Sequence, residues 1–292
     1  MAAVQGVFVV FQFFGIDPIF NAVKSEKFYS TVGFCGSRNQ LGLFFSIVSP
    51  LFYAFAPILI PLAVFCLWCA STASAWVGFL VGCLCMTFCV SKKRFALTLV
   101  TLVICSVIFF VKFENVSAGA YKERIELYKH TIESVESERV VLKVKKKIQG
   151  KDITAVKEIF CNKWFGYGFG NFTRISPYTQ HTFLKDTGIH AQKHVYTHAH
   201  NDFLEFFYDT GRIGILIVLM LMFQFFKDFI YARKTKILIV SFSCVLAQLV
   251  SAMGIFTVHT AISGMLLIIF YGIYRREINE QKRTFKRASF MV

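Results

Sequence analysis

The chain has 292 residues, of which 55% are hydrophobic and 17% are aromatic, and its formal net charge at pH 7 is +15. Soluble domains average about 45–50% apolar residues, and here the apolar residues form long blocks instead of one-sided helical stripes. These features exclude an ordinary soluble domain and predict an all-α, polytopic membrane protein. Basic clusters flank the apolar blocks, as the positive-inside rule requires, so we expect membrane lipids and no nucleic acid as partners.

We expect about seven or eight transmembrane helices in one bundle. No basic segment precedes the apolar N-terminus and no cleavage site follows it, so we expect no cleaved signal peptide. The first group of spans, in residues 1–112, begins with a short span or half-span at Val4–Gly15. Full spans are predicted at Leu41–Phe55, Pro57–Ala70, Ala75–Val90 and Phe95–Val111. Turn residues at Gly33–Asn39 and Ser71–Ser74 mark the outer face, whereas Lys92–Arg94 marks the cytoplasmic face.

Residues 113–211 form a large, partly helical loop on the outer face, and a loop of this length usually has a role. Tyr121–Lys147 and Asp152–Asn162 are predicted helices within it. The alternating glycines of Trp164–Phe172, here called the glycine-rich run, indicate a tight backbone path whose amides can hold an anion. The remaining spans, in residues 212–274, are predicted at Ile213–Phe226, Ile237–Met253 and Gly254–Tyr274, and a basic cytoplasmic tail follows at residues 275–292.

Polar residues gather where the large loop meets the membrane. Five histidines lie there: His181, His190, His194, His198 and His200. Histidine suits general-base catalysis near neutral pH, and arginine binds phosphate oxygens in a bidentate way. Because the outer face has no ATP, a reaction there would use an activated lipid-borne substrate such as a polyprenyl-diphosphate sugar. His194, His198 and His200 also suggest zinc, but no acidic or cysteine ligand stands at a fixed spacing, so we expect no metal.

Several stretches resemble one family. His200-Asn201, followed by Gly211-Arg212-Ile213-Gly214, resembles the signature of the O-antigen ligase and O-antigen polymerase superfamily. The glycine-rich run, Arg124–Tyr128 and Gly36–Gly42 are similar to three further family motifs, with Trp164 where proline is common and Tyr128 where the family has tryptophan. The resemblance covers roughly residues 30–230 in the family's order.

The resemblance implies a glycosyltransferase in the bacterial inner membrane that needs no cofactor or metal. It would move a glycan from an undecaprenyl-diphosphate carrier to an acceptor hydroxyl at the periplasmic face. It implies His200 as the base and Arg124 as the diphosphate ligand. The other expected substrate-binding residues are Arg38, Arg174, Arg212, Asn201, Gly168 and Gly170, and the structural motif residues are Gly211, Gly214 and Asn39.

The acceptor would be a lipid A–core sugar for a ligase and another lipid-linked repeat unit for a polymerase. The intact spacing from His200-Asn201 to Gly214 favours the ligase. The chain departs from the family in having fewer spans before Gly36–Gly42, so we expect it to be short at the N-terminus. It also has Ser71–Ser74 where members often carry a Ser-Arg pair, and Arg38 or Arg174 could replace that arginine.

A different class stays open, namely a lipid-sugar transporter or another non-catalytic envelope protein. Transporters usually have paired intramembrane charges or broken helices in matching halves. The apolar blocks here are almost free of ionisable residues, which favours an enzyme.

Overall fold

The computed structural model describes residues 2–17, 31–70, 72–90, 164–172, 202–254 and 260–289. These residues form helices joined by turns, and no strand occurs among them, so the all-α prediction is confirmed for this part of the chain. The chain divides into two compact units. The first, here called the bundle, holds the described residues up to 90 together with 202–203 and 218–289, and the second, here called the junction, holds 164–172 and 204–217.

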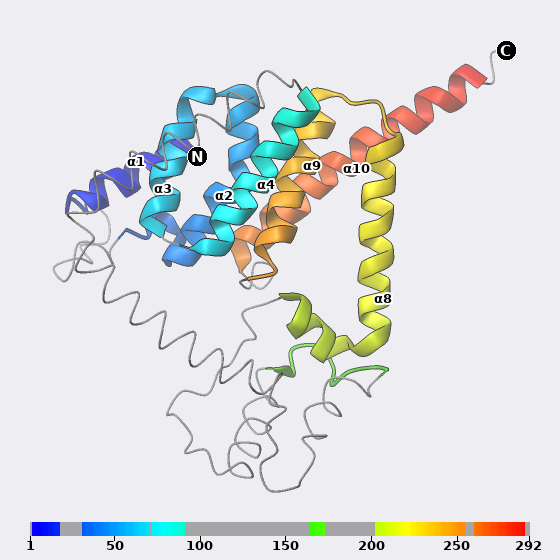
Figure 1. The fold of residues 1–292 in the computed structure, drawn as a ribbon, viewed down its shortest axis with the longest axis horizontal. Coiled ribbons are helices and arrows are strands. Elements are labelled where there is room, and N and C mark those ends of the chain that lie inside the picture. The colour runs from blue at the N-terminus through cyan, green and yellow to red at the C-terminus, as the bar shows by residue number, and fades with distance from the viewer. Residues whose placement is uncertain are drawn as a thin grey trace, which may run out of the picture. The chain divides into compact units, whose positions relative to one another are not determined.

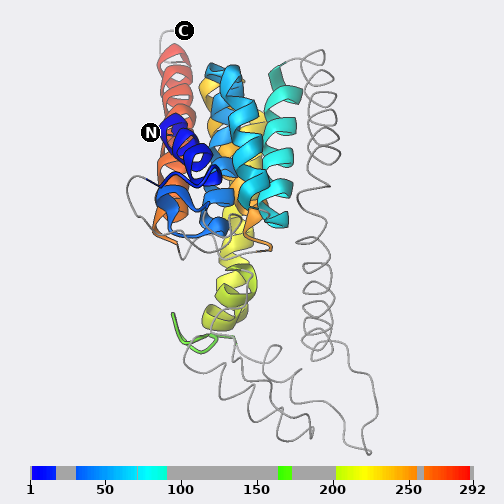
Figure 2. The same ribbon diagram turned by 90° about the vertical axis from the view of Figure 1, so that its left-hand side faces the viewer.

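The bundle is built from helices that run side by side in two views (Figures 1 and 2). Its elements are α1 (Ala2–Phe13), η1 (Gly33–Cys35), α2 (Arg38–Phe55), η2 (Pro57–Leu59), α3 (Ile60–Ala70), α4 (Ala73–Val90), α9 (Lys236–Ser251), α10 (Ala261–Ser289) and the C-terminal part of α8 (Asp202–Tyr231). Helix α2 packs against α3, α4 and α9, and α9 also packs against α4 and α10. Helices α2 and α9 therefore form the centre of the bundle.

Small residues allow α4 and α9 to approach closely. A Cβ atom added at Gly78 would lie 2.6 Å from the Ala247 carbonyl oxygen, and one added at Gly82 would lie 2.8 Å from the Ala247 Cβ. Nearby, the Ser251 hydroxyl donates to the Ser74 carbonyl oxygen at 3.3 Å. Close contacts through glycine, alanine and serine are typical of helix packing in membranes, where no water-driven burial brings helices together.

Two glutamines on the apolar helix α1 hold the backbone that follows it. The Gln12 Oε1 atom accepts from the amides of Val32 (3.1 Å) and Gly33 (2.8 Å), and the Gln5 Oε1 atom accepts from the Phe34 amide (3.0 Å). Gly33 has φ +56°, and a Cβ there would lie 2.0 Å from Gln5 Nε2. The buried backbone of this turn is therefore satisfied by α1 side chains.

The start of α2 lies within the turn predicted at Gly33–Asn39. Ser37 has an extended backbone and its Oγ atom accepts from the Gln40 amide at 3.2 Å, which is an N-cap. Helix α2 consequently begins at Arg38, and both Arg38 and Asn39 belong to its first turn.

The helices α1, α2, η2–α3, α4 and α9 agree with predicted spans within about three residues at each end. The predicted span at Phe95–Val111 and the predicted loop helices lie outside the described residues. Residues 202–210, which belong to the large loop predicted as partly helical, form the first part of α8, and α10 continues through most of the predicted tail to Ser289.

Both helical extensions have a physical reason in packing. Glu205 and Asp209, in the first part of α8, are buried. In α10 the buried residues Phe270, Tyr274 and Ile278 recur every four residues, so the packed face extends into the basic region. The predicted span at Gly254–Tyr274 begins later than expected, at Ala261.

The expected number of about seven or eight spans is not confirmed. By length and composition, two described helices could cross a membrane, Ala73–Val90 and Glu205–Tyr231. Three further apolar helices are shorter: Ala2–Phe13, Pro57–Ala70 and Lys236–Ser251.

Candidate functional site

The junction contains five of the predicted site residues: Gly168, Gly170, Gly211, Arg212 and Gly214. Arg38 and Asn39 belong to the bundle. His200, Asn201, Arg124 and Arg174 lie outside the described residues, as do His194 and His198. The structure therefore shows what surrounds the predicted glycine motifs.

Helix α8 is broken at Gly211, whose φ of 69° and ψ of −160° lie in a region that only glycine adopts readily. Figure 1 shows the ribbon of α8 bent within its length. A break of this kind leaves carbonyl groups before it and amide groups after it without helical partners. Gly211 thus has a backbone role, and other groups must satisfy the broken ends.

The glycine-rich run supplies those groups. The Gly168 amide donates to the Asp209 carbonyl oxygen at 2.8 Å, before the break. The Ile213 amide, after the break, donates to the Trp164 carbonyl oxygen at 3.1 Å. The run therefore caps both halves of α8, although about forty residues of chain separate the two segments.

The Asp209 carboxylate is held by the same run. Its Oδ2 atom accepts from the Gly170 amide at 2.7 Å, and its Oδ1 atom accepts from the Phe172 amide at 3.0 Å. Asp209 is only 4% exposed, so these charge-assisted bonds replace its water. The anion expected at the glycine-rich run is, in the structure, a carboxylate of the chain itself.

Aromatic rings reinforce this contact. The Tyr167 and Tyr208 rings stack at 4.5 Å between centroids, and the Tyr167 amide donates to the Tyr208 carbonyl oxygen at 3.1 Å. The Phe172 ring meets the Tyr208 ring edge to face at 5.1 Å. Tyr208 is therefore enclosed between two rings of the run.

Two glycines are required by close approach. At Gly166, where φ is +63°, an added Cβ would lie 2.4 Å from the Asp209 carbonyl oxygen, a backbone atom. At Gly214 an added Cβ would lie 1.8 Å from the Thr210 Oγ1 atom, which donates to the Phe206 carbonyl oxygen at 2.6 Å. The two glycines predicted as a motif are thus required for different reasons. Gly211 allows the break in α8, and Gly214 leaves the space that Thr210 occupies.

Two of the predicted site residues have identifiable neighbours. The Arg212 guanidinium carbon lies 5.4 Å from the centroid of the Trp164 ring, a cation–π contact. In the bundle, Asn39 accepts from the Thr72 hydroxyl at 3.1 Å, which joins the first turn of α2 to the turn between α3 and α4.

Sequence reasoning missed Asp209 and Glu205, the buried carboxylates of the junction, which are 4% and 2% exposed. A usable signal was present, because Asp202, Glu205 and Asp209 recur with helical spacing. When acidic residues share one face of a helix next to a glycine-rich segment, their carboxylates are better placed to accept from backbone amides than to face solvent.

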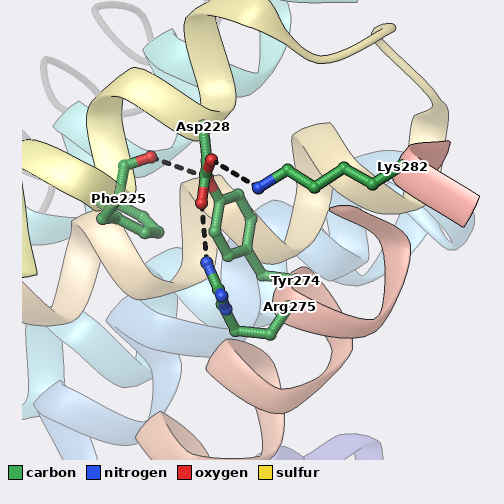
Figure 3. A network of polar contacts seen from close by, with 5 residues as sticks. All are labelled: Phe225, Asp228, Tyr274, Arg275 and Lys282. Atoms are coloured by element: carbon green, nitrogen blue, oxygen red, sulfur yellow. Dashed lines mark hydrogen bonds and ion pairs between the residues drawn. The ribbon is translucent and has the colours of Figure 1, made fainter. Parts of the chain in front are cut away.

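An ion-pair network in the bundle, centred on Asp228 of α8, was also not predicted from the sequence (Figure 3). Arg275 Nη1 lies 2.6 Å from Asp228 Oδ2, and Lys282 Nζ lies 3.1 Å from Asp228 Oδ1. Beside it, the buried Tyr274 hydroxyl donates to the Phe225 carbonyl oxygen at 2.6 Å. Two residues assigned to a basic tail therefore attach α10 to the end of α8.

The turn after α8 is attached to α10 as well. The Arg233 amide donates to Gln281 Oε1 at 2.9 Å, and Gln281 Nε2 donates to the Arg233 carbonyl oxygen at 3.0 Å. The Thr235 hydroxyl donates to Glu277 Oε2 at 2.9 Å. These contacts, together with the ion pairs of Asp228, hold the end of α8 and the turn after it against α10. The polar residues of this region therefore have a structural role.

Within the ranges that the structure covers, no three histidine, cysteine, aspartate or glutamate side chains converge on a point where a metal ion could bind. Comparison with models of known protein families finds none that matches the chain, and comparison with curated proteins finds no relative.

Proposed function

We propose that the chain is a membrane-embedded glycosyltransferase of the O-antigen ligase type. It transfers a glycan from an undecaprenyl-diphosphate carrier to a hydroxyl of a lipid A–core sugar. In this proposal the protein crosses the bacterial inner membrane several times and places residues 113–211 in the periplasm. A polymerase of the same superfamily would use a second lipid-linked repeat unit as the acceptor.

The observation that supports the proposal is the contact between two segments that each resemble a motif of the superfamily. The glycine-rich run and the segment that precedes Gly214 are distant in sequence, yet the run caps both ends of the break in α8. His200-Asn201 comes directly before the helix whose break is held in this way. Such support favours a fixed position for the candidate base.

The surface of α8 supports the membrane placement. Six large apolar side chains between residues 216 and 223 are more than half exposed: Leu216, Ile217, Leu219, Met220, Leu221 and Phe223. A continuous apolar surface of this kind is unfavourable in water and suits a lipid environment.

In the proposed reaction His200 removes the proton of the acceptor hydroxyl, whose oxygen attacks the anomeric carbon of the glycan. The bond from that carbon to the diphosphate breaks, and Arg124 with Arg174 or Arg38 neutralises the leaving diphosphate. Because the amides of Gly168 and Gly170 serve Asp209 and its backbone, we assign both glycines a structural role in this scheme. Asn201 orders the start of α8, and Arg212 anchors the loop.

The break in α8 also raises the transporter alternative, because broken helices line transporter sites near the bilayer midplane. Gly211, however, precedes the apolar segment that begins at Ile213, so the break lies at the edge of the proposed span. This position favours a site at the membrane surface.

Complementation tests the proposal. The chain is produced in a bacterial strain that lacks its own O-antigen ligase, and surface lipopolysaccharide is analysed by gel. We expect the wild type to restore long glycan on lipid A–core and His200→Ala to reduce it by at least about a hundredfold. His194→Ala is the matched control and should keep activity at equal membrane abundance.

Other outcomes separate the alternatives. Full activity of His200→Ala would contradict the assignment of the base. Restored chain length in a polymerase-deficient strain, without ligation, would favour the polymerase. Accumulation of lipid-linked glycan on the wrong membrane face in the absence of the chain would favour a transporter.

A further inference from the structure

The glycine-rich run carries an exposed aromatic surface. Trp164 is 57% exposed, and Phe165 and Phe169 are each 78% exposed. The single tyrosine of the run behaves differently, because Tyr167 stacks on the buried Tyr208. The run therefore directs one set of rings inward and leaves another set uncovered.

A hydrogen bond joins this aromatic surface to the start of the proposed span. The Trp164 carbonyl oxygen accepts from the amide of Ile213, the first residue of the apolar segment. The Trp164 ring also lies against Arg212, the last charged residue before that segment. Trp164 is thus hydrogen-bonded to the residue at which α8 would enter lipid.

The preceding part of α8 has an inverted polarity. Its carboxylates, Glu205 and Asp209, are buried, whereas Phe206 and Phe207 are partly exposed. The exposed Phe169 ring meets Phe206 edge to face at 5.7 Å. A helix with acids inside and phenylalanines outside is unsuited to water and suited to the boundary layer of a bilayer.

We propose that Trp164, Phe165 and Phe169 insert into the lipid headgroup and upper acyl region, so that the glycine-rich run is a membrane-interface anchor. This inference rests on the proposed membrane span of α8. Tryptophan and arginine are favoured at this depth, since the ring prefers the interface while the guanidinium reaches phosphate and water. The anchor would keep the start of α8, and with it His200, at the depth of a lipid-linked diphosphate.

Depth-dependent fluorescence quenching tests the anchor. Trp68 and Trp76 are replaced by phenylalanine, and the full chain is reconstituted into phosphatidylcholine–phosphatidylglycerol vesicles that carry bromine near the headgroup or near the acyl terminus. Native Trp164 is compared with three single-tryptophan variants made in the Trp164→Phe background: Phe165→Trp, Met220→Trp and Phe285→Trp. Phe285 is the matched control, because it is also phenylalanine and also 78% exposed but lies within the charged part of α10.

We expect the tryptophans at positions 164 and 165 to be quenched by shallow bromine at least about twofold more strongly than the tryptophan at position 285. The Met220→Trp variant should be quenched by deep bromine. If Met220→Trp is quenched and position 165 behaves like position 285, the anchor is wrong while the span stands. If Met220→Trp is not quenched, the span fails, and with it both the anchor and the proposed membrane enzyme.

A second measurement avoids dependence on the tryptophan replacements. Photoreactive benzoyl-phenylalanine is placed at Phe165 or Phe285 in the otherwise native chain, and lipid adducts are detected by mass after illumination in the same vesicles. The anchor predicts an adduct at position 165 that is absent at position 285. Equal labelling at the two positions would overturn the anchor. A fluorescence response of Trp164 to glycan instead of lipid would replace the anchor with a sugar-binding surface.

Discussion

Two aspartates on α8 are buried by opposite means. In the junction, Asp209 accepts from two backbone amides of the glycine-rich run. In the bundle, Asp228 accepts from the side chains of Arg275 and Lys282. The first arrangement depends on backbone conformation and hence on glycines, whereas the second depends on long side chains that reach toward water. The two sites should therefore respond differently to substitution and to salt.

The strongest effect is expected where the backbone arrangement has no spare room. Gly166→Ala would combine a left-handed φ with a clash against a backbone carbonyl, and should weaken the junction by about 3 kcal/mol or more. Gly170→Ala is the matched control, because its φ is +72° but nothing lies within 4 Å of the added Cβ, so only about 1 kcal/mol is expected. Hydrogen exchange of peptides covering 164–172 measures both, and equal protection in the two variants would refute the close contact.

Removal of the Asp209 carboxylate should have the next largest effect. Asp209→Ala leaves two amides without their acceptor, and we expect a loss of about 2–4 kcal/mol in local stability. Asp209→Asn retains one acceptor oxygen and should lose about half as much. The same exchange experiment applies, and unchanged protection of 170–172 in Asp209→Ala would show that the carboxylate is not what orders the run.

The ion pairs of Asp228 should contribute least. Arg275→Met should lower stability by about 1 kcal/mol and Lys282→Met by about 0.5 kcal/mol, because the lysine side chain is more exposed, at 56% against 36%. Thermal unfolding in detergent measures both effects. Raising the salt concentration should reduce them, while the Asp209→Ala effect should stay constant. Equal salt dependence at the two aspartates would remove the distinction drawn between them.

The helices of the bundle could be predicted from sequence because each corresponds to an apolar block of consecutive residues, which is visible without knowledge of distant contacts. The glycine-rich run was also recognised as a place for an anion. Its occupant was not, because Asp209 follows Gly170 by 39 residues and only the fold brings them together. The same limit applies to Asp228, whose partners are 47 and 54 residues away.

The full lengths of α8 and α10 were not predicted. Glu205 and Asp209 in the first part of α8 are buried, and Arg275 and Lys282 in α10 are paired with Asp228. Charged residues at helical spacing beside an apolar block were the available signal for helix continuation. The outcomes for His200, Asn201, Arg124 and Arg174 stay predictions, since these residues lie outside the described ranges.

The glutamines of α1 have a consequence for how the chain assembles during synthesis. Gln5 and Gln12 find their backbone partners 20 to 29 residues later, at Val32, Gly33 and Phe34. Contacts between segments so close in sequence form early, because little chain entropy is lost in closing the loop. The polar side chains of α1 can therefore be satisfied before any helix beyond α2 has been made, and α1 with the turn at Val32–Phe34 can serve as a template against which α3 packs.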